Sequence, residues 1–449
     1  SGVALQQVIA TYTDQAKTTL LDVKVILNEN IASSGNVGKT TITKYSACVI
    51  AATGAGAITV DPVKAIDRQV ITTTQFDLRG NALTQNVRRE YYDKTTSAFK
   101  FSESQAITNT GYDLHDRAKN TEIKRYSESG AFLELQDIVY VEYDRFGNAT
   151  DQTIATYADL NRQELVDYKV VKNTYANEAA QKRGNASTTQ AWKYDAIDPA
   201  SRQLIDYTVT ETTEFDIRGN AVRQTVDTYV GGETDGFLSS RREIHNIGID
   251  NRGDAATQEV TVYQTDKTGL ASTLGVVSFQ VLTNREYDSQ HNILNQNILT
   301  YTDAAKATLL DVQEIRNIGY HTSGVALQQV IATYSANDTN DGKGELLDVK
   351  VILNEDIASN GNVGKTTITK YSDCVIAASG EGAIEVDPAK AIDKQVITTT
   401  EFDLRGNALT QNVIREYYDE TAAAFKFSES QAITNTGYDL HDRAKNTEI

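Results

Sequence analysis

The sequence predicts an all-β protein made of tandem antiparallel β-hairpins that stack into one continuous sheet. A short motif recurs about every 37 residues along the 449-residue chain. Runs of strand-forming residues with a two-residue period flank each occurrence of this motif. A glycine followed by a small polar residue stands between the runs, where the chain must reverse. Each repeat unit is therefore predicted to form a strand, a turn and a second strand.

The recurring motif reads aromatic-Asp-x-x-Gly-Asn-Ala, as in Tyr143–Ala149, Phe215–Ala221 and Phe402–Ala408. We call its glycine position the anchor. Gln or Thr stands five residues after every anchor, and Tyr stands ten residues after it in ten of the twelve complete cases. The anchors are positions 2, 35, 80, 116, 147, 184, 219, 253, 291, 324, 361, 406 and 442, with Asp116, His291 and Asp442 in place of glycine.

The segments around the anchors alternate in the manner of strands. Val70–Phe76 precedes one anchor and Gln224–Tyr229 follows another, and both are rich in Val, Ile, Thr and aromatic residues. A loop between two helices is the alternative for any single unit, but thirteen repetitions of the pattern argue against it. Two stretches, Asp14–Lys17 and Asn177–Lys182, favour a turn or two of helix between hairpins.

A single hairpin of this kind is marginal in water, so the units are expected to stack. Rows of Gln can then hydrogen-bond along the stack, and rows of Tyr can pack while their hydroxyl groups stay hydrated. For the Tyr row, core packing is favoured over a ligand-binding row.

A larger repeat contains the small one. Leu20–Ile123 recurs as Leu346–Ile449, and thirteen of the 104 positions differ. This repeat predicts two segments: residues 1–322, one large repeat of nine hairpin units, and residues 323–449, the start of the next. The near-identity indicates a tandem duplication, and we expect the chain to be a window of a longer one.

The motif resembles the YD repeats, also called RHS repeats, of giant bacterial extracellular and toxin proteins and of teneurins. Tyr143–Asn148 matches their Tyr-Asp-x-x-Gly core, and Phe76-Asp77, Phe215-Asp216 and Tyr287-Asp288 match it more loosely. The resemblance implies hairpins that spiral into a continuous, solenoid or tube-like sheet. The unit is longer than the usual YD unit, and the family's autoproteolytic core and toxin end have no counterpart here.

The composition excludes several classes of protein. A net charge of −18 repels phosphate backbones, so nucleic acid is not expected as a partner. No apolar run is long enough to predict a membrane span. Five histidines lack metal-ligand spacing, and the two cysteines, Cys48 and Cys374, occupy one repeated position. No nucleophile elbow or phosphate loop occurs, so neither an enzyme nor a small-molecule substrate is predicted.

One segment has the spacing of a calcium loop. A four-residue insertion in the second copy creates Asn337–Asp348, and Gly342 stands at its sixth position. An ordinary hydrated hairpin loop is the alternative interpretation, and no other cofactor is predicted. The candidate oxygen ligands are Asn337, Thr339, Asp341, Glu345 and Asp348.

Two functions fit these observations. The first is a structural repeat protein that forms an extracellular fibre, tube or sheath and self-associates through stacked repeats or sheet edges. The alternative is an adhesin stalk, or a YD-type shell, that presents or encloses a terminal effector domain. Both place the protein outside the cell or at its surface.

Overall fold

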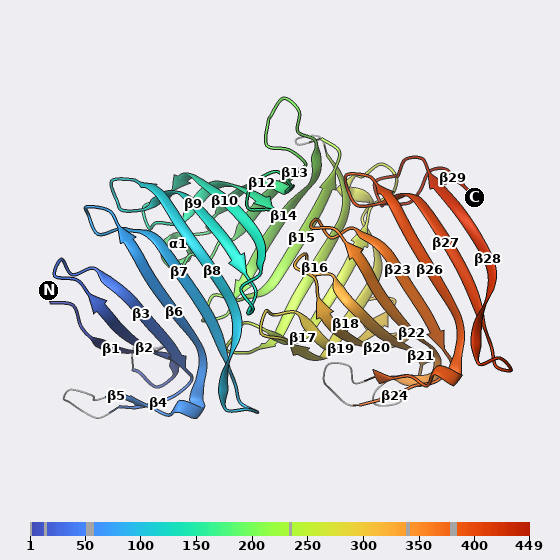
Figure 1. Cartoon of the computed structure of the whole chain (residues 1–449), viewed down its shortest axis with the longest axis horizontal. Coiled ribbons are helices and arrows are strands. Elements are labelled where there is room, and N and C mark those ends of the chain that lie inside the picture. Colours follow the sequence, from blue (N-terminus) through green and yellow to red (C-terminus); the bar gives the residue numbers. More distant parts are fainter. Residues whose placement is uncertain (1, 13–15, 51–57, 233–235, 338–341, 378–383) are drawn as a thin grey trace. The chain divides into compact units, whose positions relative to one another are not determined.

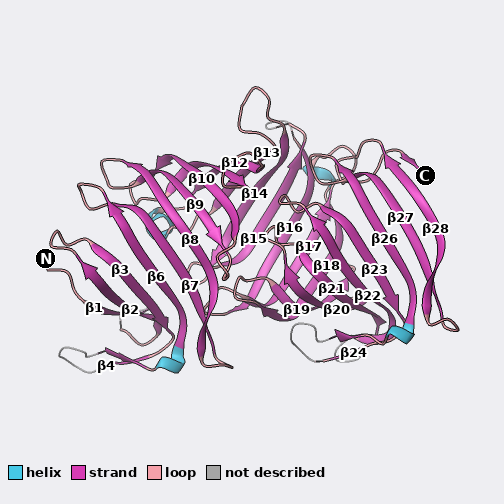
Figure 2. Ribbon diagram, in the orientation of Figure 1, coloured by secondary structure: helices cyan, strands magenta, loops and turns pink. Residues whose placement is uncertain are grey.

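The protein is all-β, as predicted. The computed structural model describes the chain except residues 1, 13–15, 51–57, 233–235, 338–341 and 378–383. Strands take up 65% of the residues, and the one α-helix among the described residues, α1 (Glu178–Arg183), has six. Figure 2 shows how strands dominate the chain. No described helix combines the length and the apolar character needed to cross a lipid bilayer.

Successive hairpins form one antiparallel sheet of 25 strands that does not close into a barrel. Strand β2 (Leu20–Ile31) illustrates the pattern, because it pairs antiparallel with the strand before it and with the strand after it. Figure 1 follows this order along the chain. The backbone groups of β2 are therefore bonded on both sides, which is the stacking that the repeat predicts.

Contacts divide the chain into two compact units. Unit 1 comprises Ser1–Ser187, Phe215–Asn220 and Ile249–Asp254. Unit 2 comprises Thr188–Glu214, Ala221–Gly248 and Ala255–Ile449. These units follow contacts, whereas the predicted boundary between residues 322 and 323 follows the sequence repeat and stays a prediction.

The elements up to Ser187 are β1 (Gln6–Tyr12), β2, β3 (Val37–Tyr45), β4 (Cys48–Ile50), β5 (Ile58–Val60), the 3₁₀ turn η1 (Pro62–Lys64), β6 (Ala65–Phe76), β7 (Ala82–Asp93), β8 (Ala98–Tyr112), β9 (Ala118–Tyr126), β10 (Phe132–Tyr143), β11 (Ala149–Tyr157), β12 (Leu165–Thr174) and α1.

The elements after Ser187 are β13 (Thr188–Tyr194), β14 (Leu204–Phe215), β15 (Ala221–Val230), β16 (Phe237–Ile249), β17 (Ala255–Gln264), η2 (Ala271–Thr273), β18 (Gly275–Tyr287), β19 (Ile293–Tyr301), β20 (Leu309–Tyr320), β21 (Ala326–Ala336), β22 (Lys343–Ile357), β23 (Val363–Tyr371), β24 (Val375–Ile376), β25 (Ile384–Glu385), η3 (Pro388–Lys390), β26 (Ala391–Phe402), β27 (Ala408–Asp419), β28 (Ala424–Asn435) and β29 (Thr447–Glu448).

The two ends of the strands form two different rims. The anchor turns lie at one end, which we call the anchor rim, and the other end is the tyrosine rim. The recurring Tyr stands at a register shift near the tyrosine rim, as at Tyr45, Tyr157 and Tyr371. Such a bulge turns the strand locally. The sequence located the tyrosines but gave no sign of the bulges.

Each unit has a modest apolar core. In unit 1, Leu135, Ala155 and Tyr157 are buried together, with Phe132 and Leu165 packed against them. The recurring Tyr thus fills core space at this position, as the sequence predicts.

In unit 2 the core cluster consists of Val330, Ala332, Val349 and Ile384. Ile384 belongs to β25, which pairs only with β24 in a small separate sheet. This short ribbon therefore contributes to the core formed by β21 and β22.

Candidate functional site: the anchor rim

An aspartate side chain closes most of the anchor turns, whereas Ala32, His321 and Ala358 stand at this position in three others. Asp77 Oδ1 accepts hydrogen bonds from the backbone N–H groups of Arg79 and Asn81, both at 2.8 Å. Its Oδ2 accepts a third bond from Asn81 Nδ2 at 2.9 Å. Gly80 has φ of +90°, the left-handed conformation that the motif's glycine predicts. The same three bonds close the turns at Asp144, Asp216, Asp288 and Asp403.

Asp77 and Asp113 are held in their ionised form. Partial burial raises the pKa of Asp77, but the hydrogen bonds from Asn81 and Arg79 outweigh burial and lower the pKa below its usual value. Arg117, bonded to Asp113, lowers the pKa of that carboxyl to about 2. An ionised carboxylate only accepts hydrogen bonds, so each turn keeps one pattern of bonds at neutral pH.

Several turns are also bonded to the next turn along the rim. Arg79 Nη2 donates to the backbone oxygen of Asp113 at 2.8 Å, and Asn81 Nδ2 donates to Asp116 Oδ1 at 2.8 Å. The second large repeat makes the same contacts through Arg405 and Asn407, which donate to Asp439 O and Asp442 Oδ1. Asn81 and Asn407 therefore each serve two turns at once.

A second set of bonds crosses three strands behind the turns. Asn317 Nδ2 donates to Ile293 O at 2.8 Å, while its Oδ1 accepts from Gln329 Nε2 at 2.8 Å. The hydroxyl group of Tyr320 donates to the same Ile293 carbonyl. We call this arrangement the asparagine rung. Its two asparagine bonds recur at Asn28, Asn109, Asn246, Asn354 and Asn435.

The rung uses the Gln or Thr that the sequence singled out. The sequence analysis did not identify the second partner, the asparagine. This asparagine lies twelve residues before the Gln or Thr, inside a run with the ordinary alternating pattern of a strand. The recurring Asn at that spacing is the signal that could have revealed it.

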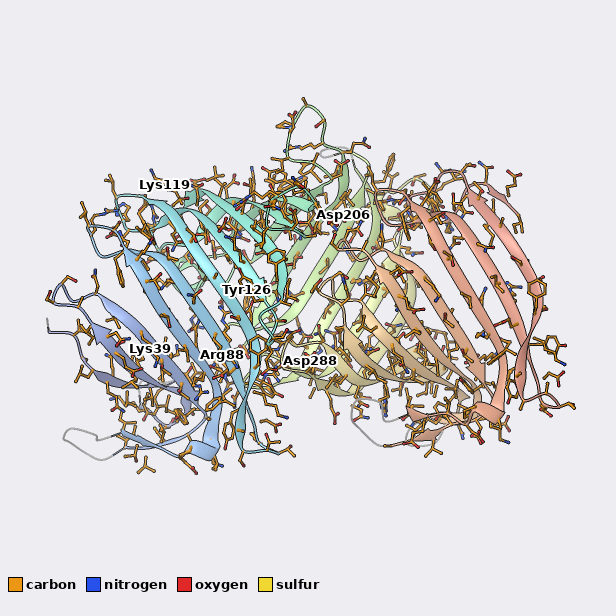
Figure 3. The ribbon with its side chains drawn as sticks, viewed as in Figure 1. Lys39, Arg88, Lys119, Tyr126, Asp206 and Asp288 are labelled. Atoms are coloured by element: carbon orange, nitrogen blue, oxygen red, sulfur yellow. The ribbon has the colours of Figure 1, made fainter. Side chains whose placement is uncertain are left out.

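The strand faces carry paired charges. Lys39 Nζ lies 2.7 Å from Glu29 Oε2, and Arg88 Nε lies 3.0 Å from Glu90 Oε1. Figure 3 places Lys39 and Arg88 on the strands of unit 1. Lys39 and Glu29 are both partly exposed, so their ion pair contributes little stability, whereas Glu90 is buried beside Arg88.

Within each unit, an anchor turn also meets the tyrosine rim of a hairpin far away in sequence. In unit 1, the Arg252 guanidinium carbon lies 5.0 Å from the centre of the Tyr91 ring. In unit 2, Ser239 Oγ donates to Leu440 O at 2.7 Å, across 201 residues of sequence.

A cavity of about 650 Å³ lies at this second contact. Leu404 and Leu440 line it from the anchor rim, and Leu204, Ile205 and Phe237 line it from the tyrosine rim. This contact had no signal in the sequence.

The predicted calcium loop is described only in part. Asn337, Glu345 and Asp348 lie within the described residues, whereas Thr339 and Asp341 lie outside them. Asn337 N–H donates to Gly342 O at 2.9 Å. Asp348 stands on β22, with its Oδ2 3.3 Å from Lys370 Nζ. The calcium site therefore stays a prediction.

The described residues offer no group of three or more His, Cys, Asp and Glu side chains placed to hold a metal ion. Cys48 and Cys374 are free and half-buried. Burial raises the pKa of Cys374 to about 11, so its thiol stays protonated at neutral pH. Its packing against the core cluster and its protonated thiol favour a packing role for Cys374 over a reactive one.

Comparisons with known proteins give structural matches alone. No protein-family model matches the chain, and no curated protein matches it. The TcdB2–TccC3–TEV crystal structure is 12% identical with a TM-score of 0.16, over 97% of this chain and 27% of that chain.

A Photorhabdus luminescens Tc holotoxin pore structure is 10% identical with a TM-score of 0.14, over 99% of this chain and 27% of that one. The TcdB2–TccC3 crystal structure is 10% identical with a TM-score of 0.15, over 99% and 33%. The chain spans a third or less of these structures. At such TM-scores the likeness carries no argument about what this chain binds or does.

Proposed function

We propose that the chain is a structural repeat protein whose hairpins build an extracellular fibre, tube or sheath without enzymatic activity. The observation that carries this proposal is the recurrence of the same bonds at successive unit boundaries. The asparagine rung and the turn-to-turn contacts join neighbouring hairpins only. An array held by nearest-neighbour bonds grows by adding units, without redesign of the units already present.

The polar side chains that recur are engaged in this construction. The anchor aspartates accept bonds from their own turns, and the rung asparagines join strands. A catalytic site on such an array needs residues that depart from the repeat and converge. The recurring aspartate and asparagine side chains instead form hydrogen bonds with backbone N–H and C=O groups. These bonds support a structural role over a catalytic one.

The placement outside the cell is supported by the sequence. A net charge of −18 disfavours binding to nucleic acid and to anionic membrane surfaces. The motif's resemblance to YD repeats points to extracellular proteins, a class in which long hairpin arrays occur.

The test is to join copies of the large repeat, residues 1–322, in tandem and to measure the products by electron microscopy. We expect particles of constant diameter whose length rises in proportion to the number of copies. As a matched control, the same number of copies would carry Asn→Ala at every rung, which removes bonds between units but keeps the length of the chain. Compact particles whose diameter grows with copy number would overturn the fibre, tube or sheath and favour an enclosing shell.

A further inference from the structure

One anchor turn is closed by a histidine instead of an aspartate. Ser323 N–H donates to His321 Nδ1 at 3.2 Å, and the Ser323 hydroxyl oxygen lies 2.8 Å from the same nitrogen. The backbone follows the other anchor turns, because Gly324 N–H donates to His321 O at 2.9 Å and Gly324 has φ of +85°. His321 Nδ1 therefore takes the place of the carboxylate oxygen that closes the turn at Asp77.

The imidazole and the carboxylate respond differently to acid. A backbone N–H group can only donate, so His321 Nδ1 carries no proton in this bond and the imidazole is neutral. Imidazole is the side chain whose charge ordinarily changes between about pH 5 and pH 8. Protonation places a hydrogen on Nδ1 and turns this acceptor into a donor. The Ser323 hydroxyl group can reverse its bond, but Ser323 N–H is left facing a second donor.

The surroundings of His321 do not compensate for a positive charge. Among the described residues, His321 forms no ion pair, and its own turn has no charged residue. The next turn along the rim, residues 358–362, has none either. The preceding turn has Asp288 and His291, and the Asp288 carboxylate accepts bonds from its own turn. Protonation of His321 therefore costs a hydrogen bond without gaining an ion pair.

We propose that the His321 turn is a pH-sensitive joint of the array, closed at neutral pH and loosened when His321 is protonated. The stabilisation from Nδ1 is present while the imidazole is neutral, and it is lost as the pH falls. The turn joins β20 to β21 at the predicted boundary between two large repeats. The switch is local to this turn, whereas its recurrence once in every large repeat rests on the proposed structural function.

The next turn along the rim lies close enough to respond. A Cβ atom added to Gly361 would lie 3.6 Å from Ser323 Oγ, which is van der Waals contact. Displacement of Ser323 therefore removes packing from the Gly361 turn. One protonation thus loosens the contact between two hairpins as well as the turn in which it occurs.

Other anchor turns supply two substitutions at the position of His321. Asp occupies this position at Asp77, and Ala occupies it at Ala358. His321→Asp provides a carboxylate, which stays ionised at about pH 5, whereas His321→Ala removes the acceptor at every pH. Both residues already occur in anchor turns with a left-handed glycine, so the fold is retained in both variants.

Hydrogen exchange of the full chain, measured by mass spectrometry at about pH 7 and about pH 5, tests the proposal. Each rate is divided by the intrinsic rate at the same pH, because amide exchange itself depends on pH. Protection of the wild-type peptide that covers Tyr320–Ala326 should fall about fivefold, which corresponds to one hydrogen bond of about 1 kcal/mol. His321→Asp should keep its protection, and His321→Ala at neutral pH should match the acidified wild type.

Wild-type protection that does not change with pH would overturn the proposal. An equal fall in His321→Asp would also overturn it, since another group, such as His291, would then be responsible. Full protection of His321→Ala at neutral pH would show that Nδ1 does not close the turn. None of these results bears on the tandem-copy measurement, which depends on the bonds between units. If tandem copies form long particles and wild-type protection is constant, only the pH-sensitive joint is wrong.

Discussion

Replacing Asn317 by Ala should weaken the sheet locally by about 2 kcal/mol. The side chain is 4% exposed, and it makes two hydrogen bonds, to Ile293 O and from Gln329 Nε2, both at 2.8 Å. Each bond contributes about 1 kcal/mol, and the partners left behind have little access to water. Alanine also lacks the volume to fill the gap, so this figure is a lower bound.

Hydrogen exchange measured by mass spectrometry is the suitable assay, since a long repeat array need not unfold in one step. Peptides that cover β20 and β21 should exchange about 30-fold faster at 25 °C, which corresponds to about 2 kcal/mol. Asn86→Ala is the control, because Asn86 is exposed on β7 and outside the rungs. A change below twofold, or equal to that of the control in its own peptide, would refute the structural role of the rung.

Three further results are expected. The pKa of Asp113 is lowered to about 2, so the amide groups of its turn should stay protected from hydrogen exchange down to about pH 4. This protection should be lost as the pH falls toward 2, because protonation removes the hydrogen-bond acceptor. Protection that does not change between pH 4 and pH 2 would show that the Asp113 carboxylate does not close the turn. Gly219→Ala should destabilise the fold by about 1 to 2 kcal/mol in thermal unfolding, because φ is +91° there, whereas Gly275→Ala, with open space around it, should have little effect. Calorimetric titration with calcium should give equal heats for the wild type and Asp341→Ala, because the Asp348 carboxylate is already paired with Lys350 and Lys370. A binding heat seen only for the wild type would establish the predicted calcium site instead.

The sequence predicts the local features of this fold well. The Asp-x-x-Gly-Asn motif contains both the positive φ of Gly147 and the carboxylate of Asp144 that closes the turn. The short helix α1 begins where Asn177 caps it, and Ala180 N–H donates to the Asn177 side chain at 2.9 Å. These features depend on residues within one turn, so sequence spacing is sufficient to find them.

The contacts that the sequence does not reveal depend on register and twist. A rung joins Asn317 to Ile293, which is a partner only after the register of β20 on β19 is set. The bond from Ser239 to Leu440 needs several hairpins of accumulated twist, and no local pattern encodes it.

The two rims differ in how freely their length varies. Along the anchor rim, five residues separate the strands at turn after turn, as from Phe76 to Ala82 and from Ile357 to Val363. The exceptions are the link that carries α1 and the link from β28 to β29. Along the tyrosine rim the length of the links varies. The link between β7 and β8 has four residues, whereas the link between β3 and β6 is long enough to contain the two-stranded ribbon β4–β5. The four-residue insertion of the second copy falls on this rim, between Tyr334 and Leu346. One side of the array thus behaves as a fixed template while the other accepts new sequence. Peptide tags or foreign loops should therefore be tolerated between Tyr126 and Phe132, where the same insertion in an anchor turn would separate neighbouring hairpins.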